Sequence, residues 1–127
     1  MAAQRINPPE LPTPGAAYSQ VVKKGTIVAT AGTIAMDSNG NVVGEGDIET
    51  QTRKVLENIS AALQAAGASM QDVIKTTVFI SDMSDYKGMN AVYGEFFSDA
   101  PPARSTVKAE LVLPSLLVEI EALAVTG

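Results

Sequence analysis

The spacing of apolar residues along the chain predicts two helices. Over residues 47–66 apolar side chains recur every three or four positions, as in an amphipathic helix. Asp47 is expected to be its N-cap, and Gly67 the left-handed residue that ends it. A second helix is predicted from about residue 84 or 85 to residue 97. Its apolar stripe consists of Tyr86, Met89, Tyr93, Phe96 and Phe97.

β-Branched residues gather in segments outside these helices and predict strands. Residues 73–80 form the clearest strand. Residues 19–23 and 26–30 are typical of a hairpin with a tight turn, and the second run continues to residue 35. Gly32 interrupts that run, which indicates a bulge or a close approach to the backbone. Two final strands are expected at residues 103–111 and 117–125.

The order β-β-α-β-α-β-β favours a single α+β domain over residues 1–127, with both helices on one face of a mixed sheet. Residues 1–17 contain four of the seven prolines. Proline fits neither a helix interior nor a central strand, so these residues are predicted to form an extended arm.

The last strand has two unlike faces, because side chains alternate along a strand. One face suits a core covered by helices; it consists of Val118, Ile120, Ala122 and Ala124. The other face carries the carboxylates of Glu119 and Glu121 between apolar ends. A mixed face of this kind is typical of one that packs against another subunit.

Composition narrows the possible chemistry. The net charge of −5 disfavours binding to nucleic acid. The chain has no histidine and no cysteine, which excludes the usual catalytic triads and the commonest zinc sites. Since no phosphate loop or calcium loop occurs either, neither a metal nor a cofactor is expected. No signal peptide or membrane span is apparent, so we expect a cytoplasmic protein without a membrane partner.

Arg104 is the best candidate for binding a ligand. Its planar guanidinium fits a carboxylate through two charge-assisted hydrogen bonds. The alternative is a surface arginine that pairs with Asp99 or with a backbone carbonyl.

Glu119 is the best candidate for acid–base chemistry. Desolvation in an apolar strand raises the pKa of a carboxyl group, which suits proton transfer near neutral pH. The alternatives are that Glu119 is an exposed edge-strand residue that discourages aggregation, or that Glu121 is the functional carboxylate. If the last two strands form an antiparallel hairpin, Arg104 and Glu119 lie opposite each other. They would then be an anchor and a water holder, or a plain cross-strand ion pair.

Three further residues have two interpretations each. Tyr18 either closes a pocket or packs beside the hairpin. Asn90 either hydrogen-bonds to a substrate or is an ordinary amide on the helix surface. Lys75 is either a buried amine suited to Schiff-base chemistry or a lysine that reaches solvent.

Two segments at fixed spacing resemble the C-terminal signature of the RidA family, also called YjgF or reactive-intermediate deaminases. They are PPARSTV at residues 101–107 and LVEIEALAV at residues 117–125. Further matches are GAAYSQVV around Tyr18, DVIKTTVFISDMSDY, and MNAVYGEFF around Asn90, so the resemblance covers nearly the whole chain. It implies a chorismate-mutase-like fold and a homotrimer whose sheets form a central barrel, with ligand clefts between subunits.

The resemblance also implies an activity and roles for residues. Family members with the arginine hydrolyse reactive enamines and imines, such as 2-aminoacrylate, to 2-oxo acids and ammonia. By motif position, Arg104 would bind the substrate carboxylate and Glu119 would hold and activate water. The residues expected to shape the cleft are Tyr18, Gly32, Thr33, Asn90 and Thr106.

This chain departs from the family pattern upstream of these residues. It has Gly15-Ala16-Ala17-Tyr18 where Gly-Pro-Tyr is common, Ala31-Gly32-Thr33 in place of Ser-Gly-Gln, and a displaced Pro114. These differences bear on the choice of substrate. We expect a deaminase of imino and enamino acids. The alternatives are an endoribonuclease or translation inhibitor, and a non-catalytic or chaperone-like trimer that binds a small carboxylate.

Overall fold

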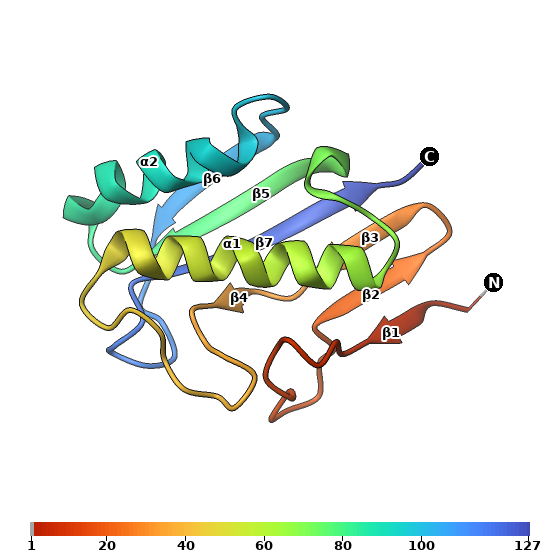
Figure 1. The fold of residues 1–127 in the computed structure, drawn as a ribbon, viewed down its shortest axis with the longest axis horizontal. Coiled ribbons are helices and arrows are strands. Elements are labelled where there is room, and N and C mark those ends of the chain that lie inside the picture. Colours follow the sequence, from red (N-terminus) through yellow and green to blue (C-terminus); the bar gives the residue numbers. More distant parts are fainter. Residues whose placement is uncertain (1) are drawn as a thin grey trace.

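One mixed sheet and two helices make up the protein, as the computed structural model of residues 2–127 shows (Figure 1). Met1, the first residue of the predicted arm, lies outside the described residues. The strands follow the order β1-β2-β3-β7-β5-β6, and β4 also pairs with β7. Both helices, α1 (Ile48–Ala65) and α2 (Tyr86–Phe97), cover the same face of the sheet (Figure 1). The predicted α+β class and its one-sided helices are therefore confirmed.

The strands are β1 (Gln4–Ile6), β2 (Val21–Lys24), β3 (Ile27–Thr30), β4 (Thr33–Ile34), β5 (Val73–Ile80), β6 (Ala103–Lys108) and β7 (Val118–Val125). Short 3₁₀ turns at Met70–Asp72 and Met83–Asp85 precede β5 and α2.

Both predicted ends of α1 are confirmed. The Asp47 side chain accepts a hydrogen bond from the backbone N–H of Thr50, as an N-cap does. Gly67 adopts a φ of 78°, and its N–H bonds to the carbonyl of Gln64. The next N–H, that of Ala68, bonds to the Leu63 carbonyl, which completes a Schellman motif.

Two buried amides on α1 hold loops to the sheet. The Gln51 side chain is fully buried; its Nε2 donates to the carbonyl of Ser115 and its Oε1 accepts from the N–H of Leu117, both at 2.8 Å. Two turns later, Asn58 Nδ2 donates to the carbonyls of Ile34 and Met36. These bonds fix the segments that lead into β7 and out of β4.

The predicted strand at residues 26–35 is broken into β3 and β4 by a bulge. Both parts pair with β7, through Ala29 opposite Leu123 and Thr33 opposite Ile120. Between these two pairs the β3–β4 segment advances four residues and β7 advances three, so the β3–β4 segment contains one extra residue. Thr30 Oγ1 accepts a hydrogen bond from the N–H of Ala122 beside this bulge. The bulge predicted at Gly32 is confirmed.

The expected hairpin between the last two strands is wrong, because β5 lies between them. β6 pairs with β5 in parallel, and β7 pairs with the other edge of β5 in antiparallel orientation. The helix α2 carries the chain from the end of β5 back to its start, and this crossover makes β6 parallel to β5. Residues 109–117 then carry the chain past β5 to β7.

The N-terminal arm contributes an edge strand. Gln4–Ile6 form β1 and pair with β2, and the strand ends before Pro8, which has no N–H to donate. The loop that follows is held by the buried side chain of Leu11 and by Gln20, whose Nε2 donates to the Pro12 carbonyl at 2.8 Å.

We predict that Gln51→Leu lowers the free energy of unfolding by about 2 kcal/mol or more, because it leaves a carbonyl and an N–H without their partner. Urea denaturation would measure the loss. Gln64→Leu on the exposed side of α1 is the matched control and should change stability much less. Equal effects of the two changes would show that the hydrogen bonds from Gln51 to Ser115 and Leu117 contribute nothing to stability.

Candidate functional site

The two candidate residues, Arg104 and Glu119, lie on opposite faces of the sheet. Arg104 is paired with Thr76, which is buried under the helices. Glu119 is paired with Phe79, on the face that no helix covers. Because neighbours across a sheet share a face, the two side chains point away from each other. One chain therefore does not bring them into a single pocket.

Neutral groups from α2 hold the Arg104 guanidinium. Nη1 donates to Oδ1 of Asn90 at 2.8 Å, and Nη2 donates to the hydroxyl of Tyr86 at 2.9 Å. The guanidinium carbon lies 4.7 Å from the centre of the Tyr93 ring, within the range of a cation–π contact. Burial raises the pKa of Tyr93, whose hydroxyl also shares a 2.6 Å hydrogen bond with Thr76. The ring is therefore a neutral, fixed platform.

The positive charge of Arg104 is not matched by a carboxylate of its own chain. Within residues 2–127, the one ion pair joins Arg53 to Glu95 between the exposed sides of the helices. The suggested pairing of Arg104 with Asp99 is therefore wrong. Two of the five N–H groups of the guanidinium are used by Asn90 and Tyr86, so three remain for a ligand.

The Glu119 carboxylate lies over the bare backbone of Gly32. A Cβ added at Gly32 would overlap a carboxylate oxygen of Glu119, so glycine at the bulge leaves the space that this side chain occupies. Burial raises the pKa of Glu119, and the negative charge of Glu121 raises it further. A carboxyl group in this state gains and loses a proton closer to neutral pH than an ordinary glutamate does.

Polar side chains of β5 lie beside Glu121 on the open face, whereas the neighbour of Glu119 there is Phe79. Thr77 is paired with Glu121, and Lys75 lies one pair further along β5. The amine of Lys75 donates to the hydroxyl of Ser105 at 2.9 Å. This contact places Lys75 among the polar side chains of the open face rather than in the core.

Tyr18, Gly32 and Thr33 line a common cavity of about 280 Å³ between the N-terminal loop and β4. Tyr18 is half exposed, whereas Thr33 is buried and its hydroxyl donates to the Ala31 carbonyl. Of these three residues, Gly32 lies against the Glu119 side chain, whereas Thr33 is paired with Ile120 on the helix-covered face. Thr106 lies two residues after Arg104 on the same face of the edge strand β6.

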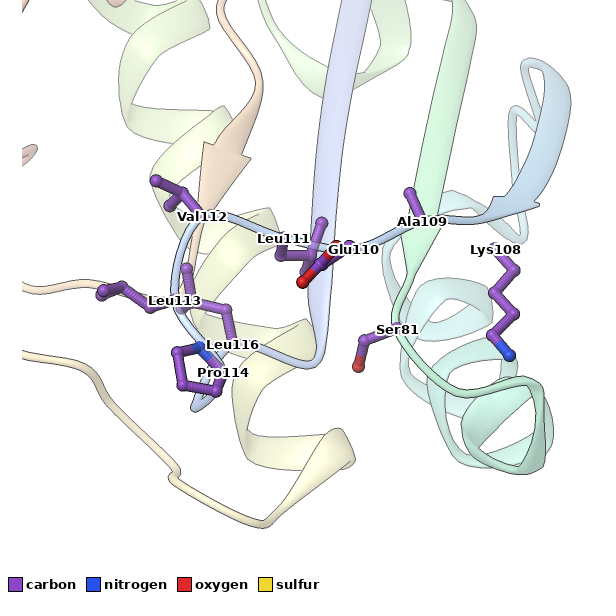
Figure 2. Close-up of a pocket in the computed structure, with 9 residues that line it drawn as sticks. All are labelled: Ser81, Lys108, Ala109, Glu110, Leu111, Val112, Leu113, Pro114 and Leu116. Atoms are coloured by element: carbon purple, nitrogen blue, oxygen red, sulfur yellow. The ribbon is translucent and has the colours of Figure 1, made fainter.

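A larger hollow of about 650 Å³ lies under the loop between β6 and β7 (Figure 2). Figure 2 shows the loop from Lys108 to Leu116 arching around it, with Val112 at the far end from Ser81. None of the predicted site residues lines this hollow.

Three residues that hold the candidate site in place are not among the residues predicted for it. Tyr86 was assigned to an apolar stripe, yet its hydroxyl binds Arg104. A tyrosine in an apolar stripe was the available signal, because a buried or half-buried hydroxyl usually finds a partner. Gln51 and Asn58 fall on the apolar side of α1, and a long amide at such a position also indicates a buried hydrogen bond.

Neither a cluster of metal ligands nor a membrane-spanning helix occurs within residues 2–127. No group of three or more histidine, cysteine, aspartate or glutamate side chains gathers there as metal ligands do. No helix in the same part of the chain is both long and apolar enough to cross a membrane.

Comparison with known proteins identifies the family. The family model described as Endoribonuclease L-PSP matches residues 9–126. The RutC family protein PH0854 of Pyrococcus horikoshii is 47% identical over 113 residues, which cover 89% of this chain and 90% of that protein. The E. coli YjgF gene product has a TM-score of 0.88 and 34% identity, covering 98% of this chain and 99% of that one. E. coli TdcF, solved with bound serine, has a TM-score of 0.89 and 36% identity at the same coverage.

The chain belongs to the YjgF/RidA family. The family match includes both separated sets of residues, the Arg104 set and the Glu119 set. The sequence resemblance to RidA proteins is therefore confirmed at the level of the family.

The raised pKa of Glu119 has a consequence for stability. A carboxyl group whose pKa is higher in the folded chain costs stability above that pKa, and the cost vanishes below the pKa of the unfolded chain. We predict that Glu119→Gln raises the melting temperature at pH 7 to 8, and that this gain shrinks as the pH falls through the two pKa values. Thermal unfolding between pH 4 and pH 8 would measure it. Glu45→Gln, at an exposed loop position, is the control. A gain that grows on acidification would contradict the raised pKa.

Proposed function

We propose that this RidA-family protein is a deaminase that hydrolyses reactive 2-imino and 2-enamino acids to 2-oxo acids and ammonia. Arg104 binds the substrate carboxylate and Glu119 activates the attacking water. The observation that carries this proposal is the Arg104 guanidinium, held in place by neutral partners with three N–H donors free. The serine bound to the related TdcF supports a small carboxylate as ligand.

The reaction needs only a positioned water and a proton carrier. Water adds to C2 of the imine while Glu119 takes one of its protons and transfers it to the imine nitrogen, which gives a tetrahedral carbinolamine with a hydroxyl and an amine on C2. Glu119 then takes the proton of that hydroxyl and transfers it to the same nitrogen; the C=O bond forms as the C–N bond breaks, and the 2-oxo acid and ammonia leave. The sum is RC(=NH)COO⁻ + H₂O → RC(=O)COO⁻ + NH₃. A carboxyl group with a raised pKa suits both proton transfers, which together contribute about 10²–10⁴-fold.

The site is completed by a second copy of the chain. Arg104 and Glu119 face away from each other within one copy, so we propose that Arg104, Asn90 and Thr106 of one subunit meet Glu119 of the next. Tyr18, Gly32 and Thr33 accompany Glu119 on its subunit. The open sheet face carries exposed apolar side chains that such assembly would cover; they are Ile27, Ile74, Val107 and Val125. A homotrimer with three clefts fits this arrangement.

Removal of the anchor should abolish most of the activity. We predict that Arg104→Ala lowers kcat/KM for imine hydrolysis by about 100-fold or more, because charge-assisted hydrogen bonds contribute about 1.5–3 kcal/mol each. A coupled assay in which an amino-acid dehydratase supplies the imine would measure the loss. Arg53→Ala, which breaks only the exposed ion pair with Glu95, should leave kcat/KM nearly unchanged. Unchanged hydrolysis in Arg104→Ala would contradict the mechanism.

Mixing two inactive variants tests whether the site is shared. Arg104→Ala and Glu119→Gln should each be inactive alone. After they are unfolded and refolded together in equal amounts, about a quarter of the sites in a cyclic oligomer pair an intact Arg104 with an intact Glu119. We therefore predict recovery of about a quarter of wild-type activity. A mixture as inactive as its components, although mass spectrometry shows mixed oligomers, would place both residues in the site of a single chain.

The endoribonuclease description of the matching family model favours RNA cleavage as a second candidate. The net charge of −5 and the absence of histidine make this activity less compatible with the sequence. RNA cleavage that persists through repeated purification and is lost in Arg104→Ala would favour it over the deaminase.

A further inference from the structure

A shallow hollow adjoins Arg104 on the helix-covered side of the sheet. It has a volume of about 260 Å³ and lies between the second half of α2 and the Pro101-Pro102 segment that leads into β6. The rings of Tyr93 and Phe97, whose centres are 4.7 Å apart, lie at its base. Figure 1 shows α2 running alongside β6, where this hollow is found. Its walls are mainly apolar; polar side chains in its lining include those of Asn90, Ser98 and Arg104, and Asn90 and Arg104 are hydrogen-bonded to each other.

Gly94 gives a second, independent observation at the same place. It lies in the interior of α2 and lines the hollow, although glycine weakens a helix relative to alanine. Its φ is not positive, and a Cβ added there would meet no atom within 4 Å. By contrast, Gly88 on the same helix has a packing reason, because a Cβ there would lie 2.8 Å from Cγ2 of Ile48. Neither backbone geometry nor packing accounts for Gly94, whose effect is to leave the hollow open.

We propose that this hollow is the subsite for the substrate side chain, and that it selects 2-imino acids with apolar side chains larger than a methyl group. This inference rests on the proposed function. With the carboxylate on Arg104, an apolar side chain of amino-acid size would extend over Gly94 toward Pro101 and Pro102. The volume is below the range typical of pockets for larger ligands, so it suits a side chain and not a nucleotide. The absence of charged groups other than Arg104 from the lining disfavours acidic and basic side chains.

Filling the hollow should change the choice of substrate. D-Amino-acid oxidase acting on D-alanine and on D-leucine generates a small and a branched imine, and C2 of an imine has no stereocentre. Competition with semicarbazide, which traps the imine, gives the rate of enzymatic hydrolysis. We expect Gly94→Leu to lower kcat/KM for the leucine-derived imine about tenfold relative to the alanine-derived imine, the size of effect typical of an altered apolar pocket. Gly94→Ala should shift the ratio in the same direction by less, with a higher melting temperature.

Ala91→Leu is the matched control, because Ala91 is exposed on α2 and does not line the hollow. It should leave the ratio of the two substrates as in the wild type. An equal loss for both imines in Gly94→Leu and Gly94→Ala, or the same shift in Ala91→Leu, would overturn the subsite. A changed oligomer size in size-exclusion chromatography of Gly94→Leu, with the substrate ratio unaltered, would assign the hollow to a subunit contact and overturn it also.

Binding of the products separates this inference from the proposed function. Calorimetry with pyruvate and 4-methyl-2-oxopentanoate requires no turnover. Tighter binding of the branched acid to wild type, reduced in Gly94→Leu, would support the subsite even if no imine were hydrolysed, an outcome that refutes only the deaminase. Hydrolysis of imines with no preference in either rate or binding would refute only the subsite.

Discussion

The alternation of side chains along a strand is the constraint on which the site depends. Arg104 is the strand neighbour of buried Thr76 on the helix-covered face, and Glu119 is the strand neighbour of Phe79 on the open face. No rotamer change moves either side chain through the sheet, and moving one to the other face would need a one-residue shift of register that would also expose the core side of its strand. The functional unit of this fold is therefore larger than one chain if both residues act together. The proposed second copy would then cover the exposed apolar residues of the open face.

Hydrogen bonds from α1 hold the backbone on both sides of Glu119 and Gly32. Gln51 fixes the segment immediately before β7, and Asn58 fixes the carbonyls of Ile34 and Met36 after the bulge. Glu119 and Gly32 lie between these two clamps. A carboxylate close to Glu121 and partly removed from water is unfavourable, so a flexible bulge would relax away from it. The buried amides keep Glu119 where its pKa is raised, at a cost to the stability of the single chain.

Local signals in the sequence were sufficient for both helices and for most strands, but not for β1, which lies in the predicted extended arm, or for the long-range pairing of strands. Asp47 and Gly67 marked the ends of α1, and Gly32 marked the bulge, because each of these residues acts on its own backbone. The partner of β6 depends on which way the chain returns after α2, which no residue of β6 encodes. The hairpin that would have joined Arg104 to Glu119 failed for that reason. The contact between the Tyr86 hydroxyl and Arg104 could not be predicted for a similar reason. Helix periodicity accounts for the position of the Tyr86 ring but not for the hydrogen-bond partner of its oxygen.

The charges of Arg104 and Glu119 are each left without an opposite charge in their own chain, as far as residues 2–127 extend. Asn90, Tyr86 and the Tyr93 ring hold Arg104 without neutralising it, whereas a carboxylate in their place would compete with a carboxylate ligand. Glu119 has the negative charge of Glu121 beside it and no cation paired with it. Both arrangements are unfavourable in isolation, and the proposed assembly gives a use for both. In that assembly the Arg104 guanidinium would meet the substrate carboxylate, and the Glu119 carboxyl group, with its raised pKa, would meet the water. The single chain keeps these two partly unsatisfied charges apart, and the proposed second subunit would bring them to one ligand.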